Sequence, residues 1–222
     1  MRTRFQQGLD DLRQRLLRMG GLAEQAVDRA RQAYVERDLT RCQMVLEGEN
    51  LINIAEREID EAAFDMLAMQ QPMAVDLRFI LAVIKINGDL ERIGDQSMSI
   101  SRRTKEILGV DDVELPVDFA AMGDFATQMI RNALQALLDG DARLADSVRE
   151  MDDEIDRMNR RAHNDLLKLI EEKPQFTQQA MNGILVAKNL ERIADHSSNI
   201  ATDVIFWIRG ADVRHQLSMA MD

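Results

Sequence analysis

The chain has 222 residues, of which 45% are hydrophobic and 30% are charged, a balance typical of a protein that buries a core. Its formal net charge of −11 argues against nucleic-acid binding, which needs clustered Lys and Arg. The single cysteine, Cys42, cannot form an internal disulfide, and the N-terminal residues lack an apolar signal core, so we expect a cytoplasmic protein. The longest apolar run, 79–84, is too short to span a bilayer, so any membrane contact should come through a partner or a surface.

The composition favours helices, because Ala, Leu, Met, Glu and Arg are abundant and only 4% of the residues are aromatic. Pro72, Pro116 and Pro174 stand at the ends of long amphipathic patterns, where a residue that cannot continue a helix is expected. Asp38 and Asp141 are placed to cap the helices that follow them. We therefore predict six helices, at residues 3–36, 39–70, 74–107, 117–138, 142–172 and 176–209.

The two halves of the chain repeat each other. A shift of 103 positions brings Gly20 onto Gly123 and Asp38 onto Asp141, and a shift of 100 positions brings seven residues of segment 90–100 onto identical ones in 190–200. Shared amphipathic spacing would explain matched apolar positions but not matched caps and carboxylates. We predict an all-α fold of two tandem three-helix bundles: a first repeat at 1–108, a linker at 109–116, a second repeat at 117–210 and a tail at 211–222.

The third predicted helix carries an apolar seam at three- and four-residue spacing, and the sixth helix repeats it. The seam residues, which we expect to be buried, are Val83, Ile86, Leu90, Ile93, Ser97 and Ile100 in the first half and Val186, Leu190, Ile193, Ser197 and Ile200 in the second. At about 100° per residue, the pairs Glu91/Asp95 and Glu191/Asp195 project away from the seam, onto an outer face.

Like charges one helical turn apart repel each other, so each acidic pair needs a positive partner, either its neighbour Arg92 or Arg192 or a metal ion. Short turns make consecutive helices antiparallel, so residues equally far from a turn lie at the same height. This count predicts two quartets: Glu49, Asn53, Glu91 and Asp95 in the first half, and Asp152, Asp156, Glu191 and Asp195 in the second. Glu56 and Asp60 fit the same pattern but lie nearer the turn, and we rank them second.

All-oxygen quartets suit hard cations such as Mg²⁺, Mn²⁺, Ca²⁺ or iron. We expect the second site to be the stronger, because it offers four carboxylates whereas Asn53 leaves the first with three. His196 and Asn199 are further candidate ligands of the second site, and Gln96 and Ser99 stand at the matching places in the first. From these residues alone, a solvated acidic face and a metal site both remain open.

The chain resembles the PhoU family of phosphate-transport regulators over about residues 5–215. The segments that carry the resemblance are Met19-Gly20-Gly21, Gly48-Glu49, Gln71-Pro72, Asp76-Leu77-Arg78, the Leu-Glu-Arg-Ile-x-Asp segments at 90–95 and 190–195, and Gly210 with Val213-Arg214-His215. The resemblance implies two adjacent three-helix bundles, frequent dimerisation, and acidic motifs that hold multinuclear metal clusters, often of iron. It places one metal motif on Asp152, Asp156, Glu191, Asp195 and Asn199, and a less complete one on Glu49, Asn53, Glu91 and Asp95.

The resemblance also implies a function. It indicates a non-enzymatic, intracellular negative regulator of the phosphate-starvation response. Such a regulator is expected to couple the ATPase subunit of a phosphate ABC transporter to a membrane sensor histidine kinase, as a homodimer that reaches the inner face of the membrane through these partners.

Two other functions compete with this one. A ferritin-like di-iron enzyme uses Glu-x-x-His on core-facing positions, and no histidine of this chain has a Glu three residues before it. A metal-free helical adaptor, whose acidic grooves dock basic partner surfaces, remains open. For either adaptor we expect Ile80, Ile84 and Met98, opposite the seam of the third helix, to be exposed and to contribute a docking surface.

Overall fold

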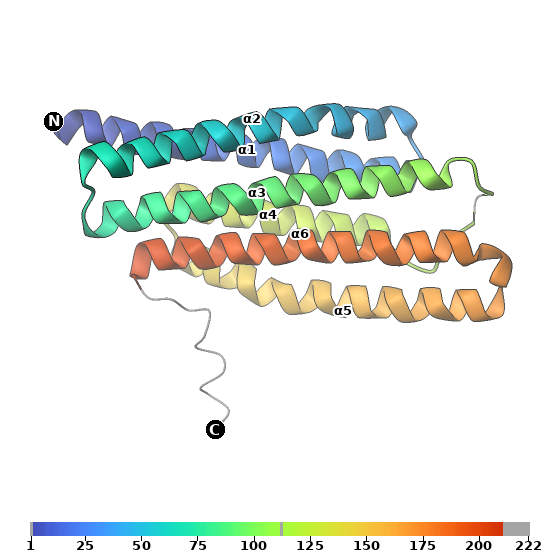
Figure 1. Ribbon diagram of the computed structural model, residues 1–222. Helices are drawn as coiled ribbons and strands as arrows, with labels where there is room; N and C mark the ends of the chain where they lie inside the picture. Colours follow the sequence, from blue (N-terminus) through green and yellow to red (C-terminus); the bar gives the residue numbers. More distant parts are fainter. Residues whose placement is uncertain (1, 112, 211–222) are drawn as a thin grey trace, which may run out of the picture.

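The computed structural model describes residues 2–111 and 113–210, and these form six long helices that run side by side (Figure 1). The helices are α1 (Arg2–Glu36), α2 (Leu39–Gln70), α3 (Ala74–Ile107), α4 (Phe119–Asp139), α5 (Ala142–Glu172) and α6 (Thr177–Arg209), with a 3₁₀ turn, η1 (Pro174–Phe176), before α6. The all-helical prediction is confirmed, with helix ends at most two residues from those expected. The predicted tail, with its Val213-Arg214-His215 segment, lies outside the described residues.

Matched caps start the second helix of each half. The Asp38 carboxylate accepts two backbone N–H hydrogen bonds, at 2.8 and 3.2 Å, and Asp141 accepts two at 2.8 and 3.2 Å. Such a cap stabilises a helix by about 1 kcal/mol. Gly140, with a φ of 64°, ends α4 in the left-handed conformation directly before the second cap. The start of α4 at Phe119, two residues later than predicted, follows from the Asp118 cap, whose carboxylate accepts the Ala121 N–H.

The two halves are related by an approximate twofold axis. Within each half the three helices pack together, and the halves join where α3 lies against α6 and α1 against α4 (Figure 1). A Cβ on Gly20 would lie 2.7 Å from Leu134, and a Cβ on the repeat-equivalent Gly123 would lie 3.1 Å from the Cβ of Arg31, which is itself equivalent to Leu134. Matched glycines therefore allow α1 and α4 to approach closely at two symmetric points.

We expect Gly123→Val to lower the free energy of unfolding by about 1–3 kcal/mol through overpacking. The added side chain would meet Cδ and Cγ of Arg31 as well as its Cβ, and the Cβ, at 3.1 Å, cannot rotate away. The same change at Gly21, where an added Cβ would meet nothing within 4 Å, is the matched control and should be neutral or slightly stabilising. Thermal melting compares the two. Equal melting temperatures would contradict the close approach of α1 and α4.

One hydrophobic core runs through both halves, and every predicted seam residue of α3 and α6 is buried in the structure. The expectation that Ile80, Ile84 and Met98 are exposed was wrong. Ile80 is 0% and Met98 4% exposed, and Ile84 is partly buried against the core. The reason is that α6 packs against α3, so α3 is covered on more sides than a separate three-helix bundle would require.

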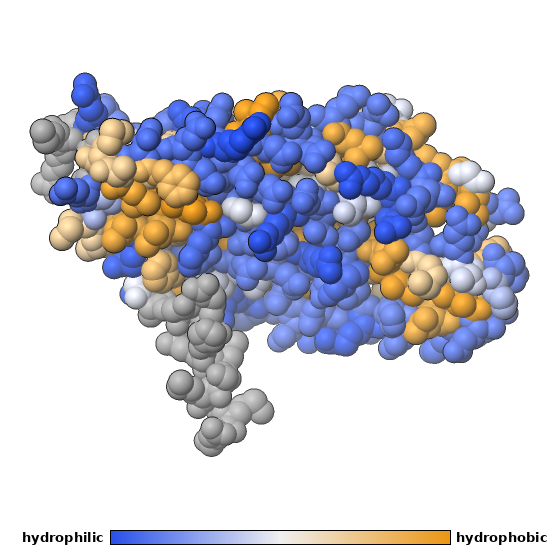
Figure 2. Space-filling view, in the orientation of Figure 1, coloured by the Kyte–Doolittle hydropathy of each residue, from blue (hydrophilic) through white to orange (hydrophobic). Residues whose placement is uncertain are grey.

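Exposed apolar residues gather instead where α2 turns into α3. Figure 2 shows a hydrophobic area over this end of the molecule and a second near the turn before α6. We call the first the hairpin patch; its residues are Phe64, Met69, Met73, Leu77 and Leu81, of which Met73 is 78% exposed. Patches of this kind are typical of protein contact surfaces. None of the described helices is both long and apolar enough to cross a membrane.

Candidate metal centre

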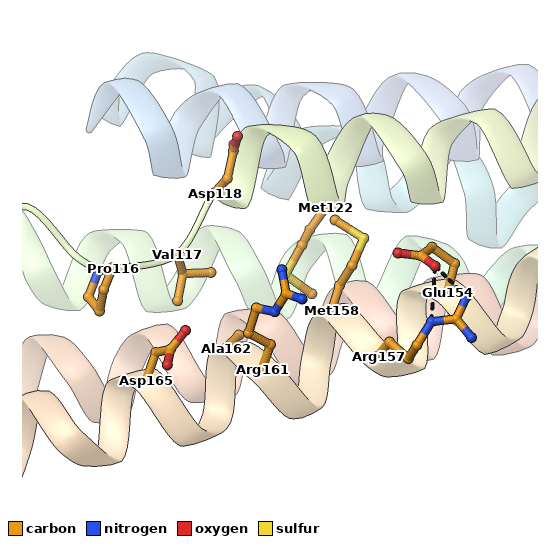
Figure 3. Close-up of a pocket in the computed structure, with 10 residues that line it drawn as sticks. All are labelled: Pro116, Val117, Asp118, Met122, Glu154, Arg157, Met158, Arg161, Ala162 and Asp165. Carbon is orange, nitrogen blue, oxygen red and sulfur yellow. Dashed lines mark hydrogen bonds and ion pairs between the residues drawn. The ribbon is translucent and has the colours of Figure 1, made fainter.

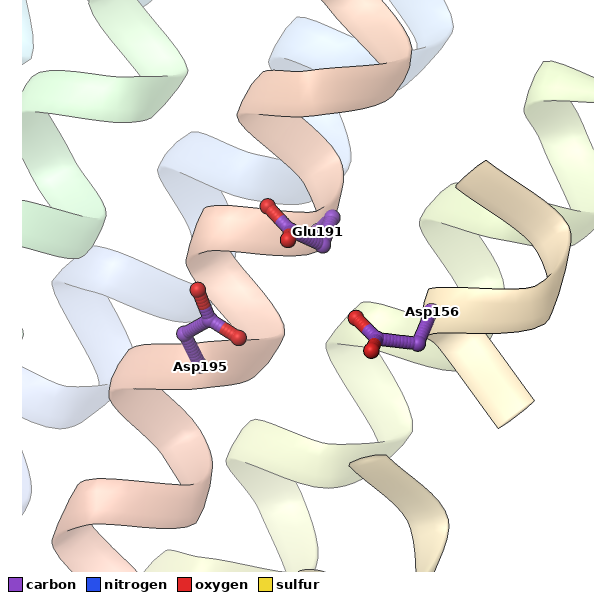
Figure 4. Close-up of side chains that lie close together, drawn as sticks. All are labelled: Asp156, Glu191 and Asp195. Atoms are coloured by element: carbon purple, nitrogen blue, oxygen red, sulfur yellow. The ribbon is translucent and has the colours of Figure 1, made fainter. Parts of the chain in front are cut away.

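Three carboxylates meet in the groove between α5 and α6 (Figure 4). Asp156 comes from α5, whereas Glu191 and Asp195 lie one turn apart on α6. One oxygen from each carboxylate lies within 4.8 Å of the others. The antiparallel packing of two amphipathic helices thus brings together three of the four residues of the quartet predicted for the second half.

Asp152, one turn before Asp156 on α5, interacts with the same group. Burial, and then the charges of Asp195 and Asp156, raise the pKa of Asp152 to about 6. Burial, and then the neighbouring Glu191, likewise raise the pKa of Asp195. In the absence of a cation, burial first and the neighbouring carboxylates second therefore disfavour the charged forms of Asp152 and Asp195.

Two carboxylate oxygens of this group are buried without a hydrogen-bond partner, Oδ1 of Asp152 and Oε2 of Glu191. A buried carboxylate oxygen is normally satisfied, so an unpartnered pair fits a cation ligand set. The helical spacing predicted an outer face for Glu191, but Glu191 is only 7% exposed. The cause is α5, which packs directly over that face of α6. All the candidate ligand atoms of this group are carboxylate oxygens, which suit a hard cation.

The positive partners of these carboxylates lie one helical turn away on the same helices. Nζ of Lys188 lies 2.6 Å from Oε1 of Glu191, and Nη1 of Arg160 lies 3.2 Å from Oδ2 of Asp156. The sequence predicted Arg192 as a candidate positive partner, whereas the structure has Lys188 and Arg160 in this place. Their spacing, three residues before Glu191 and four after Asp156, is the ordinary spacing of helical ion pairs and was the available signal. We call Asp152, Asp156, Glu191 and Asp195 the acidic cluster.

The first half gathers its acids more loosely. Burial raises the pKa of Glu91, followed by the charges of Asp95 and Glu56, so these three carboxylates face one another. Burial, and then Asp60, raise the pKa of Glu56. Glu56, which the sequence ranked second, therefore lies closer to the centre of this group than that ranking implied. Among the described residues, the tight carboxylate trio occurs in the second half alone.

Contacts between α2 and α3 fix the height of the remaining residues of the first quartet. Asn87 donates hydrogen bonds to the backbone O of Glu56 and to Oδ1 of Asp60, both at 2.9 Å, and a Cβ on Gly94 would meet Ile52 at 2.9 Å. This antiparallel register brings Glu91 level with the turn that holds Asn53 and Glu56, and Asp95 level with the turn that holds Glu49 and Asn53. Ligation by Glu49 and Asn53 stays a prediction.

The two predicted flanking ligands of the second site turn toward α3. Nδ1 of His196 lies 2.9 Å from Oδ1 of Asp89 on α3, and Asn199 lines a cavity of about 400 Å³ between α3 and α6. His196 is not part of the carboxylate trio. His196 opposes, as the smallest contribution, the burial that raises the pKa of both Glu91 and Asp195, so it lies within electrostatic reach of the acids of both halves.

A different cavity, of about 340 Å³, lies beside the segment that leads into α4 (Figure 3). Met122 of α4 and Met158 of α5 face each other across it, and Arg161 points into the space between (Figure 3). Glu154 and Arg157 at its edge are joined by an ion pair. The cavity exists because α4 begins at Phe119 and lacks a counterpart to the first four turns of α1. It holds no convergent set of acids or bases.

These features define a class: a duplicated three-helix-bundle protein with an acidic groove in each half. A protein-family model described as the PhoU domain matches this chain twice, at residues 16–104 and 119–204. The chain belongs to the PhoU family. The starts of the two matches differ by 103 positions and their ends by 100, as in the internal repeat.

Individual relatives agree with this assignment. The chain is 40% identical over 214 residues to a phosphate-specific transport system accessory protein PhoU homolog of Pseudomonas putida, covering 95% of this chain and 83% of that one. It is 39% identical to the corresponding Pseudomonas aeruginosa protein, covering 95% and 88%. The crystal structure of PhoU from Pseudomonas aeruginosa superposes with a TM-score of 0.89 at 38% identity, covering 93% of this chain and all of that one. These relatives are accessory proteins, which confirms the non-enzymatic prediction.

Proposed function

We propose that the chain is an intracellular negative regulator of the phosphate-starvation response that acts on phosphate uptake. Its relatives are accessory proteins of phosphate-specific transport systems, which supports a role in the same process. In this role the chain is an adaptor between the ATPase subunit of a phosphate ABC transporter and a membrane sensor histidine kinase. It is cytoplasmic and reaches the inner face of the membrane through these partners.

The acidic cluster of the second half holds a hard metal ion in this proposal. The observation that carries it is the pair of buried, unpartnered oxygens on Asp152 and Glu191 beside Asp156 and Asp195. The bound cation supplies positive charge that removes the repulsion between carboxylates and ties α5 to α6. Iron is the metal that the resemblance favours, and Mg²⁺, Mn²⁺ or Ca²⁺ accept the same ligands. Asn199 remains a candidate further ligand.

A weaker site in the first half completes the proposal. Its ligands are Glu49, Asn53, Glu91 and Asp95, with Glu56 added on the basis of its electrostatic interaction with Glu91. The looser gathering of these carboxylates and the amide at position 53 support a lower affinity than in the second half.

The alternative is a metal-free adaptor, and one observation favours it. Arg160 and Lys188 already pair with two carboxylates of the acidic cluster, so part of its charge is balanced without a metal. In that case the cluster would act on basic partner surfaces alone, and partner binding would survive chelation.

Partner capture tests the proposed function and separates the two versions. The purified chain is expected to sediment as a homodimer, with the hairpin patch in a protein contact, and to retain the transporter ATPase subunit and the kinase. Chelation should weaken retention if the metal is regulatory. A strict monomer at micromolar concentration that retains neither partner would contradict the adaptor role.

A further inference from the structure

The groove between α5 and α6 continues past the acidic cluster into a cavity of about 460 Å³. Its polar lining consists of Asn159, Arg160, His163 and Asn164 from α5 and Lys188 from α6. No carboxylate lines this cavity. One groove therefore has an acidic half and, one helical turn further along both helices, a largely apolar half whose polar groups are cations and amides. We call the second half the basic cavity.

The basic cavity has no counterpart in the first repeat. The equivalent positions there hold Glu56, Arg57, Asp60, Glu61 and Gly88, so three carboxylates replace two amides and a histidine, and the lysine is lost. Only the arginine is shared. Because the rest of the groove is duplicated, this reversal of charge is a property of the second repeat and not of the fold.

The arginine and the lysine of the basic cavity both form ion pairs with carboxylates of the acidic cluster. Arg160 pairs with Asp156 at 3.2 Å, and Lys188 pairs with Glu191 at 2.6 Å. Both carboxylates are also ligand candidates for the proposed metal. A cation bound by Asp156 and Glu191 competes with Arg160 and Lys188 for the charge of the same two carboxylates and so weakens both ion pairs. The positive charges of Arg160 and Lys188 then face the cavity.

We propose that the basic cavity binds a phosphate group through Arg160, Lys188 and His163, and that a cation in the acidic cluster strengthens this binding by releasing Arg160 and Lys188. The strengthening by a cation rests on the metal centre of the proposed function. Phosphate binding itself depends only on the lining of the cavity.

The chemistry of the lining favours this ligand. A guanidinium presents paired N–H donors that match two phosphate oxygens, and an ammonium adds a point charge. The amides of Asn159 and Asn164 provide further N–H donors. Ile184 and Leu185 form the apolar part of the lining, where the organic portion of a phosphate ester would lie. Free phosphate and an organic phosphate share the group that is recognised, and the experiment separates them.

Equilibrium dialysis with radiolabelled inorganic phosphate measures the site, on protein treated with chelator and on protein loaded with metal. We expect the loaded protein to bind phosphate at least about tenfold more tightly, which corresponds to about 1.4 kcal/mol. Arg160→Gln with Lys188→Gln should remove most of this binding and leave the metal content unchanged. Arg57→Gln with Lys168→Gln removes two charges from elsewhere in the chain and should leave phosphate binding unchanged.

A metal-independent variant separates failure of the cavity from failure of the metal centre. Asp156→Asn with Glu191→Gln removes the two competing carboxylates, so the chelated variant should bind phosphate more tightly than the chelated wild type. If the variant gives that result and the wild type takes up no metal, the cavity is supported and the metal centre is contradicted. Absence of phosphate binding by both the metal-loaded wild type and this variant would overturn the proposal.

Two further outcomes are informative. If phosphate binding to the loaded protein survives Arg160→Gln with Lys188→Gln, the anion is held by the metal and the basic cavity is not its site, which also overturns the proposal. Glycerol 3-phosphate provides the second arm. Tighter binding of the ester than of free phosphate supports an organic phosphate as the ligand, and the reverse supports the free anion.

Discussion

Replacing Asp152 and Asp156 with Asn is expected to abolish the metal-dependent stabilisation of the chain. A ligand that binds only the folded state stabilises it by about 2.7 kcal/mol when present at 100 times its dissociation constant. For a protein of this size, that corresponds to a rise of about 5–10 °C in melting temperature. The wild type should show this rise on metal addition and the double variant should show almost none, because two of the four carboxylates of the acidic cluster are gone.

The first repeat provides the matched control. Glu49→Gln with Glu56→Gln also removes two carboxylates from one helix, but from the site with the looser acids. Most of the metal-dependent rise in melting temperature should survive in this variant. Equal loss of the rise in both double variants would contradict the asymmetry between the two repeats.

In the presence of chelator the same carboxylates should make the protein less stable as the pH rises. The pKa of Asp152 is about 6 in the folded chain and 3.8 in its ordinary environment, so the folded state binds this proton more tightly than the unfolded state does. The stabilisation that follows is fully present below pH 3.8 and is lost as the pH rises through 6. Burial and neighbouring charges raise the pKa of Asp195, Glu91 and Glu56 too, and these groups act in the same direction.

Asp152→Asn isolates this effect, because an amide resembles the protonated carboxyl group. At pH 7.5 the chelated variant should exceed the chelated wild type in free energy of unfolding by about 1 kcal/mol. This is well below the roughly 3 kcal/mol of a fully buried group, since the side chain is only half buried. Near pH 4.5 most of the difference should be gone. Denaturant titrations at the two pH values provide the measurement, and a pH-independent difference would contradict the mutual repulsion of the acids.

The helices and the acidic cluster could be predicted from the sequence because both depend on local spacing. Caps such as Asp38 and Asp141 act within one turn of the chain, and the position of Asp156 opposite Glu191 and Asp195 follows from counting along two antiparallel helices. Spacing along one helix and the next was thus enough to bring these residues together, although it did not show that α5 buries Glu191.

Features that depend on contact between the two repeats could not be predicted in this way. Ile80 and Met98 belong to an apolar face that one bundle alone would expose, and they are buried because α6 covers it. His196 turns from the acidic cluster to Asp89 for the same reason. Side-chain choice among near neighbours is a further limit: Lys188 and Arg160, rather than Arg192, reach the carboxylates. Two basic residues lie within a turn of Asp156 and two within a turn of Glu191, and spacing alone does not rank them.

Elemental analysis of the chain purified without added metal tests the central claim most directly. The wild type is expected to contain a hard metal ion, with iron favoured. The Glu49→Gln, Glu56→Gln variant is expected to retain it. The Asp152→Asn, Asp156→Asn variant is expected to lose most of this metal at unchanged helical content. A wild-type chain that contains no metal and takes up none on loading, or an Asp152→Asn, Asp156→Asn variant that retains the wild-type amount, would contradict the claim.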